Sequence, residues 1–233
     1  MSSVLIHRDC GEQLNAKATV LALHGYGGDC GQLEELCNVL RVPIAGVLPQ
    51  AWRSLNAHGF AVSDQPGQSW FFSYGDDRPE PATFGDSLLE LEQLVHELLG
   101  HHAAERPLFL IGYDQGAVLA LTLAQVIPDS LAGVVAICGY IPRIRGWSPP
   151  ISDLQNLPVL LIDDPTRTDN RAVFGSDCEG RVTRLNGQVK VRSVPGVFGK
   201  PLLAEAEINT WIASLLNRIE ARSMPGLNDT IVL

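Results

Sequence analysis

The sequence predicts an α/β fold in which helices cover both faces of a mostly parallel central sheet. Two observations lead to this prediction. Short apolar segments of strand length alternate with helical patterns along most of the chain. The apolar segments are near-continuous runs of Val, Ile and Leu, which is typical of strands that are buried on both faces. Such alternation favours parallel strands joined by crossover helices.

Each element is predicted from its own pattern, in chain order. Six apolar segments are predicted as strands, namely residues 18–23, 42–48, 108–111, 131–137, 159–162 and 189–194. Residues 83–99 and 204–219 carry apolar side chains at helical spacing, and residues 115–127 are apolar almost all round, as in a helix packed deep against a sheet. We expect one domain over residues 1–222 and a frayed tail over residues 223–233.

Composition narrows the class of protein and its partners. The 233 residues are 45% hydrophobic and 18% charged, which allows a large core. A net charge of -9 disfavours nucleic acid and anionic membranes as partners. The N-terminus lacks a secretory pattern, and no apolar run approaches the roughly 18 residues of a membrane span, so we expect a cytoplasmic protein. Its five cysteines show no paired spacing and are predicted to be reduced.

The most informative motif is the segment Leu108-Phe-Leu-Ile-Gly-Tyr-Asp-Gln-Gly-Ala117. It has the pattern of a strand, a sharp turn and a helix, and such turns usually present a serine nucleophile. Here the central residue is Asp114, between Gly112 and Gly116, and we call this turn the elbow. The six histidines all precede the elbow, and they are His7, His24, His58, His96, His101 and His102.

Three segments together resemble the phospholipase/carboxylesterase family of α/β-hydrolases, which includes acyl-protein thioesterases and small bacterial esterases. The first is Leu23-His-Gly-Tyr-Gly-Gly-Asp29, the second is Gln68-Ser-Trp-Phe71, and the third is the elbow. The resemblance covers residues 18–216 and implies an α/β-hydrolase fold. It also implies an oxyanion hole made by the backbone amides of Tyr26 and Gln115.

The residues expected at the family's Ser-His-Asp triad have changed chemical type. The resemblance places Asp114 at the serine position, Arg167 at the acid position with Asp169 two residues later, and Lys200 at the histidine position. An ammonium group with a pKa near 10.4 is a poor proton acceptor at neutral pH. We therefore expect an Asp114–Lys200 ion pair, with Asp114 able to occupy the oxyanion hole.

Several functions remain open from these residues. The preferred interpretation is an atypical, non-hydrolytic small-molecule enzyme that uses Asp114 and Lys200 as acid/base or electrostatic groups. The close alternative is a catalytically silent pseudo-hydrolase that binds a small molecule or a protein. Lesser alternatives are a hydrolase in which Asp114 is the nucleophile, and a residual ester or thioester hydrolase that uses another nucleophile such as Cys138.

The same patterns predict the surroundings of the site. The candidate pocket-lining residues are His24, Trp70, Phe71, Cys138, Arg167 and Asp169. No Gly-x-Gly-x-x-Gly motif is present, so no organic cofactor is expected. Asp163, Asp164 and Asp169 could suggest a metal, but no histidine is near and we expect a solvated loop without metal. A small-molecule ligand is the expected partner, and a homodimer is implied by the resemblance alone.

Overall fold

The computed structural model describes residues 5–55, 67–74, 78–101, 106–144, 146, 153–168 and 177–223. Seven strands form one sheet in the order β1-β3-β2-β6-β7-β8-β9, in which β1 is antiparallel to β3 and all other neighbours are parallel. The strands are β1 His7–Gly11, β2 Ala18–Leu23, β3 Ile44–Pro49, β6 Leu108–Tyr113, β7 Gly133–Ile137, β8 Pro158–Asp163 and β9 Gln188–Ser193. A separate two-stranded sheet pairs β4 Arg53–Ser54 with β5 Gln68–Ser69.

The predicted fold class is confirmed, and each of the six predicted strands has its counterpart in the main sheet. The sequence pattern did not predict β1, because four of its five residues are exposed and polar or glycine, as suits a strand at the edge of a sheet. The last strand, β9, is also only partly covered. The fully buried strands β2, β3, β6 and β7 form the centre of the sheet, as their apolar runs predict.

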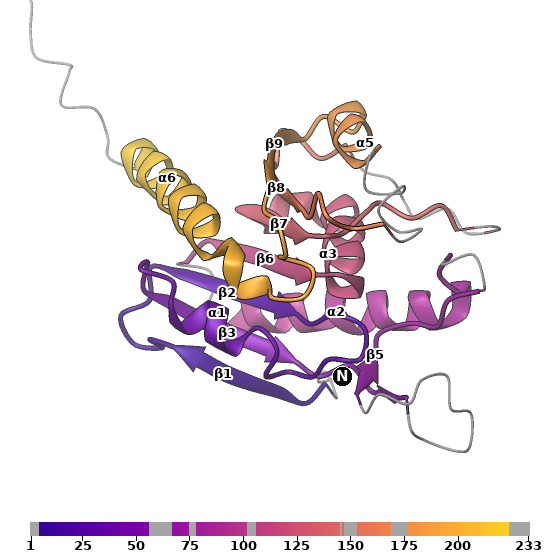
Figure 1. Cartoon of the computed structure of the whole chain (residues 1–233). Coiled ribbons are helices and arrows are strands. Elements are labelled where there is room, and N and C mark those ends of the chain that lie inside the picture. Colours follow the sequence, from indigo (N-terminus) through magenta and orange to yellow (C-terminus); the bar gives the residue numbers. More distant parts are fainter. Residues whose placement is uncertain are drawn as a thin grey trace, which may run out of the picture.

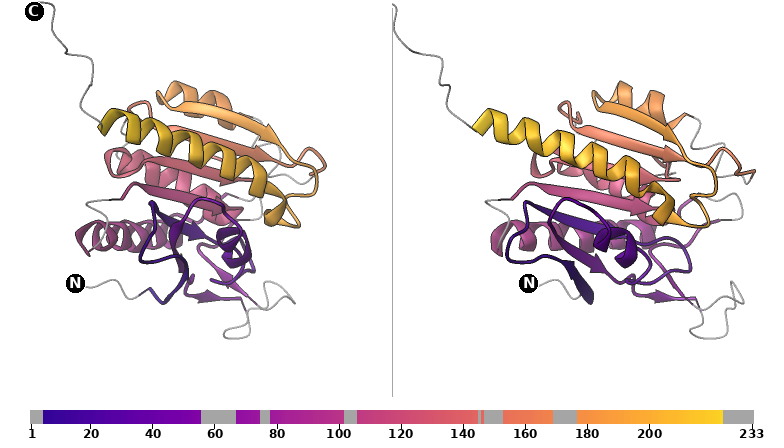
Figure 2. Two further views of the ribbon diagram at one scale, coloured as in Figure 1. Left: turned by 90° about the vertical axis from the view of Figure 1, so that its left-hand side faces the viewer. Right: turned by 60° about the vertical axis from the view of Figure 1, so that its left-hand side comes forward.

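Helices cover both faces of the sheet (Figures 1 and 2). Two hydrophobic clusters lie between the sheet and these helices, one on each face. On one face, α2 Pro81–His101, α3 Gln115–Val126 and α5 Cys178–Arg184 contribute buried side chains to the first cluster. On the other face, α1 Glu34–Asn38 and α6 Glu205–Ser223 contribute to the second. Two short 3-10 helices, Pro128–Ser130 and Pro201–Ala204, complete the described elements.

The parallel register brings three chain segments together at one edge of the sheet. Leu23 at the end of β2 pairs with Gly112 of β6, and Tyr113 pairs with Ile137 at the end of β7. The loops that follow these strands therefore meet around the elbow. Ligands of open α/β sheets bind at this carboxyl edge.

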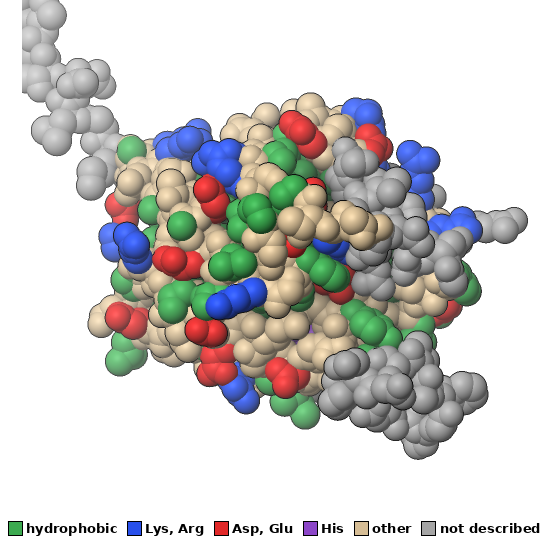
Figure 3. All heavy atoms as spheres, viewed as in Figure 1, with side chains coloured by type: hydrophobic (Ala, Val, Ile, Leu, Met, Phe, Trp, Pro, Cys, Tyr) green, Lys and Arg blue, Asp and Glu red, His purple; other side chains and the backbone are tan. Residues whose placement is uncertain are grey.

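In the described part of the chain, surface charge, membrane-spanning character and potential metal ligands do not point to a second site. On the face shown in Figure 3, acidic and basic side chains are interspersed. Within the described ranges, no helix combines the length and the apolar character that a membrane crossing requires. The described residues also contain no group of three or more His, Cys, Asp or Glu side chains placed to hold a metal ion.

Candidate functional site

Asp114 lies at the sharp turn between β6 and α3. Its backbone has φ of 50° and ψ of -112°, a conformation that non-glycine residues rarely adopt. The neighbouring Gly116 makes the turn sterically possible, because a Cβ atom there would lie 2.1 Å from the carbonyl oxygen of Leu23. The backbone therefore has the strained strand-to-helix geometry that the elbow motif predicts.

The carboxylate of Asp114 is directed at the loop that follows β2. Its Oδ2 atom accepts a hydrogen bond of 3.1 Å from the backbone amide of Tyr26, which is one of the two predicted oxyanion donors. The residue is only 5% exposed. A Cβ atom at Gly25 would lie 3.1 Å from the Cβ atom of Asp114, so this glycine allows the loop and the elbow to approach closely. The carboxylate thus lies where an amide donor can stabilise negative charge.

The side chain of Gln115 holds the adjacent loop. Its amide oxygen accepts hydrogen bonds from the hydroxyl of Ser69 at 3.1 Å and from the backbone amide of Trp70 at 3.0 Å. Its amide nitrogen donates to the carbonyl of Phe71 at 2.8 Å. Gln115 was selected from the sequence for its backbone amide, and the structure adds a positioning role for the side chain that the motif did not predict.

His24 is buried beneath this loop and has its ring fixed. Its Nε2 atom accepts a hydrogen bond of 3.1 Å from the backbone amide of Ala51, which leaves Nδ1 to donate to the carbonyl of Gly25 at 2.8 Å. Burial lowers the pKa of His24, and the hydrogen bond to Gly25 offsets this in part. The ring also packs at 4.9 Å from that of Trp70, whose Nε1 donates to the carbonyl of His24. His24 therefore supports the loops as a neutral side chain.

Trp70 and Phe71, which were predicted to line a pocket, are buried in the hydrophobic core. Trp70 belongs to the first cluster together with Phe71, and the ring of Phe71 packs edge-on against that of Phe84 in α2 at 5.1 Å. The indole nitrogen of Trp70 is used by the His24 carbonyl. Both side chains thus stabilise the loop beside the elbow.

The structure describes both Asp114 and Lys200, and these two side chains form no ion pair with each other. The prediction of an Asp114–Lys200 ion pair is therefore wrong. Lys200 is exposed and immediately precedes the 3-10 helix at Pro201. Its backbone amide donates to the carbonyls of Gly196 and Val197, both at 3.2 Å. This tight turn leaves the side chain of Lys200 on the surface.

Asp164, which directly follows β8, holds the loop after β9. Its carboxylate accepts hydrogen bonds from the backbone amides of Gly196 at 3.1 Å and Phe198 at 3.0 Å. It also accepts from the amide of Thr166 at 2.9 Å and the hydroxyl of Thr166 at 2.6 Å. Burial alone would raise the pKa of Asp164, but these hydrogen bonds outweigh it and lower the pKa to about 2.

The prediction of a solvated loop is therefore wrong at Asp164, which is only 4% exposed. The physical reason is the four hydrogen bonds that compensate the burial of the carboxylate. A signal was present in the sequence, because Asp-Pro-Thr after a strand is typical of a turn in which the aspartate side chain accepts the amide two residues later. What could not be predicted was the long-range contact with Gly196 and Phe198.

Arg167 and Cys138 contact each other in the loops that follow β8 and β7. The guanidinium of Arg167 stacks at 3.8 Å from the centre of the Phe198 ring and donates to the carbonyl of Cys138 at 3.2 Å. Burial raises the pKa of the Cys138 thiol to about 12, although Arg167 opposes this. A thiol with so high a pKa is a weak nucleophile at neutral pH. Asp169 lies outside the described residues.

Tyr113, immediately before Asp114, connects the elbow to the same loop. Its hydroxyl donates to the carbonyl of Phe198, and burial raises its pKa. Asp164, Arg167 and Tyr113 thus all contact the segment around Phe198. The structure brings together Asp114 with Tyr26, Gln115 with Trp70 and Phe71, and Arg167 with Cys138, while the side chain of Lys200 faces solvent.

This sheet order, with its antiparallel edge strand and the strained turn between β6 and α3, defines an α/β-hydrolase fold. A model of the phospholipase/carboxylesterase family matches residues 10–195, and the chain belongs to this family. The resemblance noted from the sequence is therefore confirmed. The match ends before Lys200, so the assignment of Lys200 to the histidine position stays a prediction.

Similar proteins include esterases and thioesterases. An acyl-protein thioesterase 1 from Debaryomyces hansenii is 28% identical over 200 residues, which are 78% of this chain and 84% of that protein. The esterase-like protein NocK of Nocardia uniformis is 30% identical over 149 residues, 63% of this chain. The matched region spans only 40% of NocK, so this chain corresponds to less than half of that relative.

Solved structures share the fold at low sequence identity. A carboxylesterase from Mesorhizobium loti superposes with a TM-score of 0.74 at 19% identity, covering 90% of this chain and 94% of that one. Acyl-protein thioesterase 2 from Zea mays gives a TM-score of 0.69 at 20% identity, covering 91% and 99%. At these identities the likeness establishes the fold.

Proposed function

We propose that this chain is a non-hydrolytic member of the carboxylesterase family, a pseudo-hydrolase that acts by binding. The observation that carries the proposal is the hydrogen bond of 3.1 Å from the Tyr26 amide to the carboxylate of Asp114. An oxyanion hole works because its donors are available to the charge that develops on a substrate. Here a side chain with its own negative charge uses one of the donors.

Among the described residues, neither His24 nor Lys200 is a suitable base, which supports the same proposal. Ester hydrolysis at an elbow needs an imidazole that accepts and returns a proton near neutral pH. His24 has both ring nitrogens engaged and a lowered pKa, and Lys200 is exposed. An ester formed on Asp114 would need a base to activate the attacking water. The thiol of Cys138, with its raised pKa, is a weak substitute for the nucleophile.

A second candidate function is the acid/base enzyme that uses Asp114. The strained backbone of Asp114, with φ of 50°, favours it, because strain of this kind is concentrated at functional sites. In that case a substrate would displace the carboxylate from the Tyr26 amide and give up a proton to it. Lys200 would have no part in the reaction unless its loop moved.

Hydrolysis assays test the proposal directly. The wild type and the Asp114→Ser variant are incubated with p-nitrophenyl acetate, p-nitrophenyl butyrate and an acyl-coenzyme A thioester at pH 7 to 8. We expect both proteins to hydrolyse each substrate at the buffer rate, since the variant gains a hydroxyl while His24 is engaged and Lys200 is exposed. Wild-type turnover that Asp114→Asn abolishes would overturn the proposal. Turnover by Asp114→Ser alone would show that a base lies near the elbow.

A further inference from the structure

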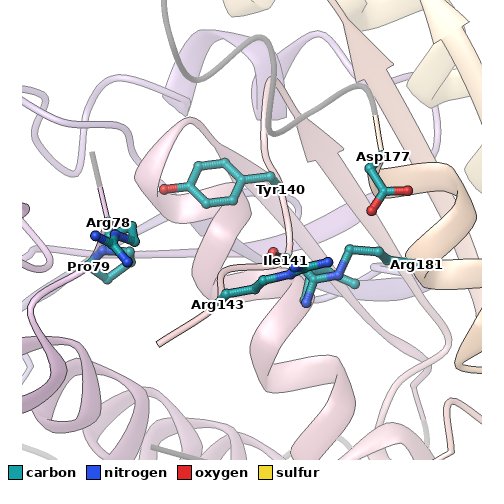
Figure 4. A pocket seen from close by; sticks show the side chains of 7 residues that line it. All are labelled: Arg78, Pro79, Tyr140, Ile141, Arg143, Asp177 and Arg181. Carbon is teal, nitrogen blue, oxygen red and sulfur yellow. Dashed lines mark hydrogen bonds between the residues drawn. The ribbon is translucent and has the colours of Figure 1, made fainter. Parts of the chain in front are cut away.

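A cavity of about 280 Å³ lies between the segment before α2, the segment after β7 and helix α5, and three arginines line it (Figure 4). Its lining residues are Arg78, Pro79, Tyr140, Ile141, Arg143, Asp177 and Arg181. An adjoining cavity of about 270 Å³ shares Arg78, Pro79 and Arg143 with the first. Together they reach the size of a small-molecule site. We call the first of them the arginine cavity.

Three separate segments supply its arginines. Arg78 precedes α2, Arg143 follows β7, and Arg181 belongs to α5. The β7 segment begins next to the elbow, because a Cβ atom at Gly139 would lie 2.4 Å from the Cβ atom of Ala117 in the first turn of α3. The arginine cavity is thus at the carboxyl edge of the sheet, where α/β folds place their ligands.

The backbone fixes the position of one of these cations. The guanidinium of Arg181 donates to the carbonyl of Ile141 and, at 3.4 Å, to that of Pro142. Burial lowers the pKa of Arg181, and the positive charge of Arg143 lowers it further. Figure 4 shows Arg143 and Arg181 directed toward the same part of the cavity. Two positive charges that are near enough for one to lower the pKa of the other favour a bound anion.

One carboxylate lines the cavity. Asp177, at the start of α5, forms an ion pair of 3.4 Å with Arg184, which does not line the arginine cavity, and its negative charge also raises the pKa of Arg181. The described lining residues therefore carry an excess of positive charge in a chain whose net charge is -9. The rest of the lining is apolar or aromatic, with Tyr140, Ile141 and Pro79. This combination matches a ligand with an anionic group and an apolar part.

We infer that the arginine cavity binds a small organic dianion, a phosphate monoester or a dicarboxylate, whose apolar part contacts Tyr140 and Pro79. Guanidinium groups bind phosphate and carboxylate oxygens in a bidentate manner, and Arg143 and Arg181 together match a charge of two. This site consists of residues other than Asp114 and Tyr26. Turnover at Asp114 would overturn the proposed function and leave this inference standing.

Isothermal titration calorimetry with phenyl phosphate, succinate, inorganic phosphate and acetate tests the inference. We expect saturable binding of phenyl phosphate or succinate with one site per chain, at least tenfold tighter than acetate. Tighter phenyl phosphate than inorganic phosphate would show that the apolar part contributes. A preference for phenyl phosphate over succinate would assign a phosphate monoester, and the opposite order a dicarboxylate. Dianions that bind no tighter than acetate would overturn the inference.

Variants separate a built site from general charge attraction. Arg143→Ala removes an exposed lining cation and should weaken phenyl phosphate or succinate binding at least tenfold. Arg222→Ala is the matched control, because it removes one exposed positive charge from α6 on the opposite face of the sheet. It should change the affinity less than twofold. Equal losses in the two variants, or none in Arg143→Ala, would overturn the inference.

Discussion

Buried carboxylates have different roles in two regions, the loops around the elbow and the loops that follow β8 and β9. Around the elbow, the backbone forms the strained turn between β6 and α3, and the Asp114 carboxylate accepts a hydrogen bond from the Tyr26 amide. After β8 and β9, the buried Asp164 carboxylate binds the backbone of the neighbouring loop. Both regions thus hold the loops of the site in place, and we propose that their side chains do not carry out hydrolysis.

This comparison indicates that the contacts that position the loops need not be the groups that carry out the chemistry. The elbow is held by close backbone contacts and by Gln115, neither of which requires a catalytic side chain. The loop around Phe198 is held by Asp164, Tyr113 and Arg167. These contacts stabilise the loops whether or not the site is catalytic. Replacing each of these contacts tests how much each region contributes.

The largest effect is expected from Asp164→Ala. It removes four hydrogen bonds to a buried charged acceptor and leaves the amides of Gly196 and Phe198 without that partner. The free energy of unfolding should fall by about 3 kcal/mol, because hydrogen bonds to charged groups contribute more than neutral ones. Urea denaturation measures it. Asp163→Ala, at an exposed neighbouring position, is the control and should cost far less.

The acid sensitivity of the fold should follow Asp164 as well. Its pKa is about 2 in the folded chain and near 3.9 in an unfolded one. Because the unfolded chain binds more protons between these values, the contribution of Asp164 is fully present above about pH 4 and is lost as the pH falls toward 2. The Asp164→Asn variant should lose less stability over that interval. An identical pH profile would contradict the assigned role.

Gln115→Ala should have the next largest effect, and it tests the elbow side. It deprives the Trp70 amide, the Ser69 hydroxyl and the Phe71 carbonyl of a buried partner. The expected loss is about 2 kcal/mol of unfolding free energy. Gln125→Ala in the same helix is the control, because the Gln125 side chain donates back to Leu121 of its own helix. Similar losses for the two variants would refute the loop-positioning role.

A smaller effect is expected from Tyr113→Phe. It removes only the hydroxyl that donates to the carbonyl of Phe198, while the ring keeps its place beside that of Phe198. The unfolding free energy should fall by about 1 kcal/mol. Thermal denaturation of the variant and the wild type measures it. An unchanged melting temperature would mean that this hydroxyl does not stabilise the loop after β9.

Local patterns predicted the elements that depend on local physics. The apolar runs predicted the buried strands, and Gly112-x-Asp114-x-Gly116 predicted the strained turn, because both follow from burial and backbone sterics. The exposed edge strand β1 was not predicted, because its residues lack the apolar pattern. The family, known from three short motifs, was predicted correctly.

Contacts between distant residues were not predictable from the pattern. The contact of Asp164 with Gly196 and Phe198, and the engagement of both ring nitrogens of His24, join segments far apart in the chain. The expected Asp114–Lys200 pair failed for the same reason, since charge complementarity does not fix which way a loop turns its side chain. The arginine cavity likewise joins three segments that share no motif.

The most direct test of the central claim is the unfolding free energy of the Asp114→Asn variant, measured by urea denaturation against the wild type. The substitution keeps the shape of the side chain and removes its charge. If Asp114 is the resident anion at the Tyr26 amide and the first turn of α3, the variant should be less stable by about 1 kcal/mol. A more stable variant would contradict the account, because it would mark Asp114 as a strained catalytic residue whose charge the fold does not need.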